Sequence, residues 1–139
     1  MRRMIRTLGF AVFLFVGVTA CATAYDEAEM QRMASAATKV ARQLDAYIFA
    51  YPEAAELPPE KLVDVITGRD AELMAALDQY HVQFRAMGEN SSVLICSKDG
   101  SRALLEDAGC SAISDLHEWD GAALPCEFSL DLEKVCSAP

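Results

Sequence analysis

Residues that could carry acid–base chemistry gather in one short segment, Ser114–Asp120. It places the imidazole of His117 near the carboxylates of Asp115, Glu118 and Asp120, and these are the residue types of a general acid and a general base. Catalysis would also need a nucleophile held by a base and an orienting third group, and the sequence has no G-x-S-x-G elbow. A small hydrolase that uses His117 is therefore an alternative hypothesis rather than the leading one.

The same segment carries the single tryptophan of the chain, Trp119. Together with His117 and Asp120 it forms a candidate recognition patch, because an indole combines a large apolar surface with an N–H donor. In a small domain a lone tryptophan more often fills the core, and both alternatives stay open. The acids of the segment lack the ligand spacing of an EF-hand loop. We expect no metal site and no other cofactor.

The cysteines fall into two groups, one near the N-terminus and one in the last third of the chain. The first group is Cys21 alone, and the second is Cys96, Cys110, Cys126 and Cys136. The later four are 14, 16 and 10 positions apart, which is unlike the close C-x-x-C pairs of zinc sites and thioredoxin-like enzymes. They predict two disulfides and an oxidising compartment. Of the three pairings, the most local one joins Cys96 to Cys110 and Cys126 to Cys136, and we favour it.

The N-terminus has the layout of a secretory signal. Arg2, Arg3 and Arg6 precede a 13-residue apolar run over residues 8–20. This run is shorter than the roughly 20 apolar residues that a membrane-spanning helix needs. We therefore expect residues 1–20 to be a signal peptide and residues 21–139 to be a single exported domain.

Residues 18–21, V-T-A-C, resemble the bacterial lipobox, whose cysteine is lipidated and becomes the new N-terminus. The resemblance implies lipidation at Cys21, and Ala22 in the next position implies sorting to the outer membrane of a Gram-negative cell, facing the periplasm. A competing A-x-A site at residues 22–24 would make 1–24 the signal and release a soluble periplasmic protein. Both routes leave four cysteines in the exported domain.

The first 50 residues also resemble, in outline, a type IV pilin or pseudopilin. A short basic leader ends at Gly9-Phe10, and an apolar stretch and a long amphipathic helix follow. The resemblance implies a structural subunit of a pilus or secretion apparatus, cleaved after Gly9. The chain departs from that pattern at Leu14, where those proteins usually carry Glu, and in its shorter apolar run.

The exported domain is strongly acidic. Removing residues 1–20 takes away three of the twelve Lys and Arg and none of the 21 Asp and Glu, so the formal charge changes from −9 to −12. Phosphate backbones and anionic lipid surfaces are bound through clustered Lys and Arg. We therefore expect no nucleic-acid partner and no membrane contact beyond a lipid anchor, and we expect the partner to be an envelope protein or a peptidoglycan-associated component.

Hydrophobic periodicity divides the exported domain into a helical part, 26–77, and a strand part, 80–106. A helix is predicted over 26–50, with one apolar face that packs on its own domain and a stop at Pro52. Its face consists of Met30, Met33, Ala37, Val40, Leu44, Tyr47 and Tyr51. A second helix should begin at Leu57-Pro58-Pro59-Glu60 and end near Gly68, and a third should follow an Asp70 N-cap.

The pattern then changes to the two-residue period of strands, with Val82, Phe84 and Ala86 on one face. A second strand is expected over 93–96 and a third around 102–105, joined by a hairpin at Asp99-Gly100. The tail, 107–139, should be loop-rich and cross-linked by disulfides, with one last strand at 127–132.

These patterns predict an α+β domain, in which N-terminal amphipathic helices pack on a small antiparallel β-meander and a disulfide-stapled segment follows. The leader, the cysteines and the lack of a catalytic constellation favour a non-catalytic binding or accessory module of a bacterial envelope. The pilin-like subunit and the hydrolase are the alternatives.

Overall fold

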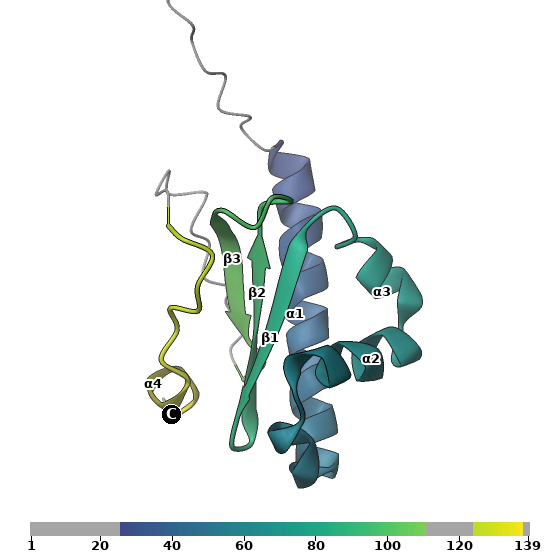
Figure 1. Ribbon diagram of the computed structural model, residues 1–139, viewed down its shortest axis with the longest axis vertical. Coiled ribbons are helices and arrows are strands. Elements are labelled where there is room, and N and C mark those ends of the chain that lie inside the picture. Colours follow the sequence, from purple (N-terminus) through teal and green to yellow (C-terminus); the bar gives the residue numbers. More distant parts are fainter. Residues whose placement is uncertain (1–25, 111–123, 138–139) are drawn as a thin grey trace, which may run out of the picture.

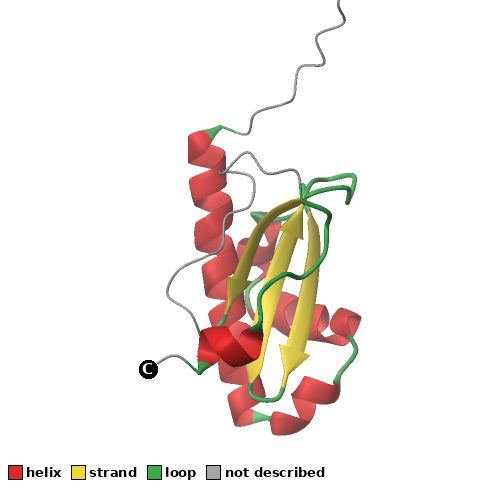
Figure 2. Cartoon of the chain, turned by 90° about the vertical axis from the view of Figure 1, so that its left-hand side faces the viewer, coloured by secondary structure: helices red, strands yellow, loops and turns green. Residues whose placement is uncertain are grey.

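A computed structural model of the chain describes residues 26–110 and 124–137 (Figure 1). A long helix packs across a three-stranded antiparallel sheet, which confirms the predicted α+β architecture. Shorter helical segments connect the long helix to the sheet, and the C-terminal segment covers the opposite face of the sheet (Figure 2). Within the described residues, no helix is both long and apolar enough to cross a membrane.

Helix α1 spans Glu27–Ala50. Asp26 caps its N-terminus by accepting the amide of Ala28, and Glu27 and Glu29 lie in the first turn, where the helix dipole favours negative charge. Its buried face is the predicted one as far as Leu44. Beyond it the prediction is wrong in part, because Ile48 is buried, Tyr47 is only partly buried and Tyr51 is 48% exposed. This face packs on the protein's own sheet.

Three short helical segments link α1 to the sheet: η1 (Pro52–Glu56), α2 (Pro59–Arg69) and α3 (Ala71–Ala75). The 3-10 segment η1 was not predicted, whereas α2 and α3 were. Asp70 caps α3 by accepting the amide of Leu73 at 3.0 Å, as the sequence suggested. Leu62 and Ile66 of α2 are buried and complete the core on this side.

The sheet consists of β1 (His81–Met87), β2 (Asn90–Cys96) and β3 (Ala103–Ala108), in the order β1-β2-β3. Gly88-Glu89 is a two-residue turn between Met87 and Asn90, and Gly88 adopts the φ of 61° that the first position of such a turn requires. The Asp99-Gly100 turn joins β2 to β3, as predicted. Strand β3 extends beyond the predicted end and includes the buried acids Glu106 and Asp107.

The two faces of the sheet have separate cores. The helix face, covered by α1 and α2, carries Phe84, Val93 and Ile95. The tail face carries Leu94, Cys96 and Ala103, with Cys126 and Phe128 packed on them. A register shift beside Cys96 leaves both Leu104 and Leu105 in the helix-face core, as expected of a β-bulge, where two residues oppose one.

A polar contact joins α1 to the sheet inside the helix face. The hydroxyl of Ser91 on β2 donates to the carboxylate of Asp45 on α1. Burial raises the pKa of Asp45; the Ser91 hydrogen bond opposes this shift, and the nearby charge of Asp107 adds to it. Gly109 lies against this contact, and a Cβ there would be 2.3 Å from the Asp45 Cγ. A side chain at residue 109 would therefore prevent the close approach of the residue after β3 to helix α1.

The strand predicted at 127–132 is wrong. Residues 127–131 are irregular, and a short helix, α4 (Leu132–Cys136), follows them. Asp131 caps this helix by accepting the amide of Lys134. The alternation of polar and apolar residues in this segment does not produce a strand. The amides of residues 129–130 donate to the Glu106 side chain rather than to the backbone of a neighbouring strand.

Candidate binding groove

An apolar groove of about 580 Å³ runs along the outer edge of β1. Its walls come from η1, the loop that follows it, α2, β1 and the C-terminal segment. The lining residues are Ala55, Leu57, Pro59, Glu60, Leu62, Val63, Val82, Gln83, Phe84, Arg85, Ala86 and Phe128. Leu57 is 37% exposed at its rim, whereas Leu62 and Phe84 are buried in its lining.

The groove borders a free strand edge. Among the described strands, β1 pairs with β2 alone and therefore lies at an edge of the sheet. The pair Met87–Asn90 closes a two-residue hairpin, which makes it a hydrogen-bonded pair. Since hydrogen-bonded and non-bonded pairs alternate, the backbone groups of Val82, Phe84 and Ala86 point away from β2. Within residues 26–110 and 124–137, these outward groups have no hydrogen-bond partner.

The groove has an apolar wall on each face of the sheet. On the helix face, Leu62 and Val63 of α2 lie beside the side chains of Phe84 and Ala86. On the tail face, Phe128 lies beside Gln83 and Arg85, and the Arg85 guanidinium stacks on its ring at 4.6 Å from the centroid. The groove therefore encloses the edge of β1 from both sides.

A buried polar network fixes the Phe128 wall. The side chain of Arg85 donates to the Leu130 carbonyl at 2.8 Å and lies 3.5 Å from the Glu106 carboxylate, which is fully buried. Glu106 accepts the amides of Ser129 and Leu130 at 2.7 and 3.1 Å. These bonds compensate for the burial of the carboxylate and hold the backbone next to Phe128.

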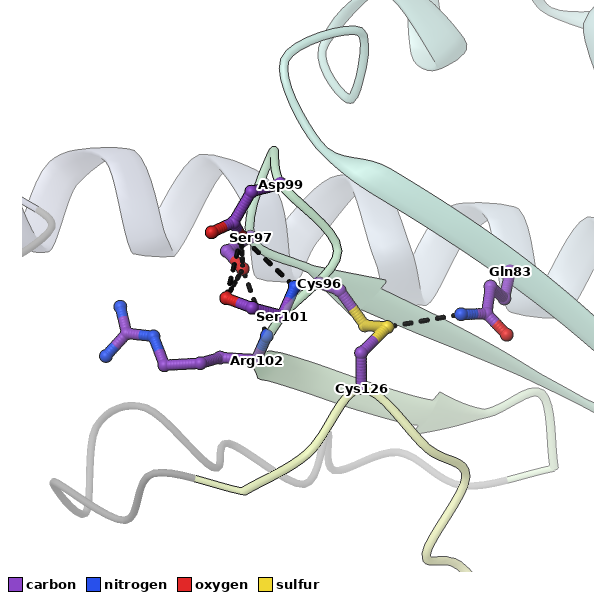
Figure 3. Close-up of a disulfide and its surroundings, with 7 residues drawn as sticks. All are labelled: Gln83, Cys96, Ser97, Asp99, Ser101, Arg102 and Cys126. Carbon is purple, nitrogen blue, oxygen red and sulfur yellow. Dashed lines mark hydrogen bonds between the residues drawn. A yellow bond between two sulfur atoms is a disulfide. The ribbon is translucent and has the colours of Figure 1, made fainter.

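A disulfide holds the same wall from its other end. Cys96 pairs with Cys126, with their Cα atoms 5.7 Å apart, and the Gln83 amide donates to the Cys126 sulfur at 3.1 Å (Figure 3). Cys96 ends β2, so this bond ties the C-terminal segment to the sheet two residues before Phe128. The adjoining turn is closed by Asp99, which accepts from the hydroxyls of Ser97 and Ser101 at 2.6 and 2.8 Å.

The second disulfide joins Cys110 to Cys136, so the predicted local pairing is wrong. Cys96 and Cys110 lie at opposite ends of the β2–β3 hairpin, because Cys96 faces Ala103 at the start of β3 and Cys110 follows its end. Six extended residues span about 20 Å, whereas a disulfide requires Cα atoms roughly 4.4–6.8 Å apart. The two bonds are therefore interleaved along the sequence.

The other site residues suggested by the sequence lie outside the described residues. These are the lipidation candidate Cys21 and the candidate patch of His117, Trp119 and Asp120. Among the described residues, no three His, Cys, Asp or Glu side chains gather in a group that could hold a metal ion. Sequence reasoning missed the groove, although the first strand of a three-stranded meander must lie at an edge and Pro58-Pro59 fixes where α2 begins beside it.

No family model, no curated protein and no solved structure matches the chain.

Proposed function

We propose that this chain is a small exported protein of a bacterial envelope that acts as a non-catalytic binding module, lipid-anchored at Cys21 or released into the periplasm. The basic and apolar leader, the lipobox-like residues 18–21 and the even number of later cysteines support export. The proposed partner is another envelope protein or a peptidoglycan-associated component.

The observation that carries the binding role is the apolar groove beside the free edge of β1. Its Phe128 wall is cross-linked to the sheet through Cys96 and Cys126 and fastened by Glu106. A wall held in this way is preorganised, so a ligand would not have to order it on binding. The binding surface proposed here is thus the groove rather than the segment around Trp119.

Site-specific photo-crosslinking in the cells that make the protein tests this role. A photoreactive residue at Leu57, on the groove rim, should give a defined adduct with an envelope component. The same residue at Arg42, exposed on α1 and outside the groove, is the matched control. Equal labelling from both positions, or none from Leu57, would refute the groove as the binding surface.

The intact mass of the protein recovered from fractionated cells tests the anchor. An acylated species that starts at Cys21 supports the lipoprotein, and a species that starts at Tyr25 supports the soluble form. A start at Phe10 would instead favour the pilin-like subunit. That second candidate draws support from α1, since a long amphipathic helix does follow the apolar run.

A further inference from the structure

We infer that the groove binds an extended peptide segment of the partner, which adds as a fourth strand to the edge of β1. The segment would be apolar at alternating positions and would carry a Lys or Arg next to Glu60. This inference rests on the proposed function and specifies its ligand class.

The backbone of β1 supplies the first argument. Val82, Phe84 and Ala86 present outward N–H and C=O groups at every second residue, which is the pattern that an incoming strand would pair with. Unprotected edges are usually blunted by Lys, Pro or a bulge. Strand β1 contains neither Lys nor Pro, its Arg85 is turned to Glu106 and the Leu130 carbonyl, and its pairing with β2 runs without a register shift.

The two walls supply the second argument. Successive side chains of an added strand point to opposite faces of the sheet. One set would contact Leu62 and Val63 on the helix face, and the other would contact Phe128 on the tail face. A helix in the groove would present one apolar face only, so walls on both sides of the edge favour an extended ligand.

Charge supplies the third argument. Of the two charged residues that line the groove, Arg85 is already paired with Glu106 and with the Leu130 carbonyl. Glu60 is exposed, lines the groove and forms no ion pair with any other described residue, so it is available to a cation. A second copy of the chain is a poorer occupant, because it would bring together two domains that each carry a formal charge of −12 after residues 1–20 are removed.

The test starts from an unbiased library of phage-displayed octapeptides selected on the oxidised, processed protein. The enriched peptides should alternate apolar residues with others and include Lys or Arg. The strongest one is then synthesised with N-methyl groups on one or the other set of alternate residues. Methylation of the set that faces β1 should weaken binding at least tenfold, and methylation of the other set should not.

Variants of the protein test the same geometry from the other side. Ala86→Pro removes an outward N–H without removing a bond to β2, and prolines are tolerated at such edge positions; it should abolish peptide binding, while Ala86→Ser should retain it. Glu60→Gln should weaken binding about two- to fivefold. Glu56→Gln, which removes an exposed acid outside the groove lining, is its matched control and should have no effect.

Three results would overturn strand addition: no enrichment, enriched peptides with a helical repeat, or binding that is equally sensitive to both methylation sets. A dimer in sedimentation equilibrium that Ala86→Pro dissociates would overturn it too, because the edge would then pair with itself. If any of these appears while the Leu57 crosslink persists, the proposed function stands and only the binding mode fails. Loss of the crosslink as well would remove both.

Discussion

The carboxylate of Glu106 accepts both the amide and the hydroxyl of Ser129, at 2.7 and 2.9 Å, across 23 residues of sequence. This contact fastens the C-terminal segment to the sheet, because the same carboxylate also accepts the Leu130 amide. Hydrogen bonds to this one buried acid thereby hold the segment, in place of the strand pairing that the sequence suggested.

Replacing that acid should loosen the segment. Glu106→Gln keeps the shape of the side chain but removes the charge that strengthens three hydrogen bonds and pairs with Arg85. We expect the free energy of unfolding to fall by about 2 kcal/mol in urea denaturation. Asp64→Asn is the control, since its ion pair with Lys61 is exposed and should contribute less than about 1 kcal/mol. Equal losses in the two variants would contradict this account.

The disulfide connectivity predicts a specific peptide map. Proteolysis without reduction should release one peptide that links Cys96 to Cys126 and another that links Cys110 to Cys136. Replacing Cys96 and Cys126 together with Ala should lower the free energy of unfolding by about 2–4 kcal/mol. Peptides that link Cys96 to Cys110 would show that this arrangement of the tail is incorrect.

Two glycines should respond oppositely to alanine. In Gly109→Ala the new Cβ would meet the Asp45 Cγ at 2.3 Å and the Ala41 carbonyl oxygen at 2.6 Å, so we expect a loss of about 1–3 kcal/mol. Gly68, in α2, has no neighbouring atom within 4 Å of such a Cβ. Gly68→Ala should raise stability by about 0.5–1 kcal/mol through helix propensity. Thermal unfolding of both variants provides the measurement.

Ionised Asp45 should lower the stability of the domain at neutral pH, and this loss should disappear in mild acid. Burial raises the pKa of Asp45 above 3.8 in the folded protein, so the folded state holds this proton more tightly than the unfolded chain. Its destabilising contribution is fully present above the raised pKa and disappears as the pH falls from that pKa to 3.8. Asp45→Asn should therefore be more stable than the native protein at pH 7, with the difference shrinking towards pH 4. A difference that does not change with pH would contradict this.

Asp99 should have the opposite pH dependence. Hydrogen bonds from Ser97 and Ser101 lower the pKa of Asp99 from 3.8 to about 2. The folded state therefore favours the charged form, so its stabilisation is present above 3.8 and is lost as the pH falls towards 2. NMR titration of the Asp99 carboxyl should give the low pKa directly, and a Ser97→Ala, Ser101→Ala double variant should raise it. An unshifted value in the native protein would refute the turn geometry.

Much of the fold follows from local patterns in the sequence. The period of the apolar residues predicts α1, and the Asp99-Gly100 turn predicts the β2–β3 hairpin. The end of β3 was missed because Glu106 and Asp107 are charged, and the burial of Glu106 is compensated by contacts with distant segments that the local sequence does not show. The same holds for residues 127–131, whose conformation depends on Glu106 rather than on their own propensity.

The correct cysteine pairing could have been narrowed down from the sequence alone. A hairpin between Cys96 and Cys110 separates them by the length of a strand, so predicting the hairpin already excludes their disulfide. The groove is harder to foresee. Its position at the β1 edge follows from strand order, but the Phe128 wall arises from the interleaved bonds and the Arg85–Glu106 pair, which join segments far apart in sequence.

The order of the elements along the chain has a consequence for folding. Helix α1 and the three strands precede the segment that covers the tail face, and this segment provides Cys126, Cys136 and the partners of Glu106. A chain synthesised from its N-terminus therefore has all the residues of the helix-face core while Leu94 on the tail face is still uncovered and Glu106 lacks its bonds to Ser129 and Leu130. The C-terminal segment therefore docks last, and formation of the Cys96–Cys126 and Cys110–Cys136 disulfides completes the fold.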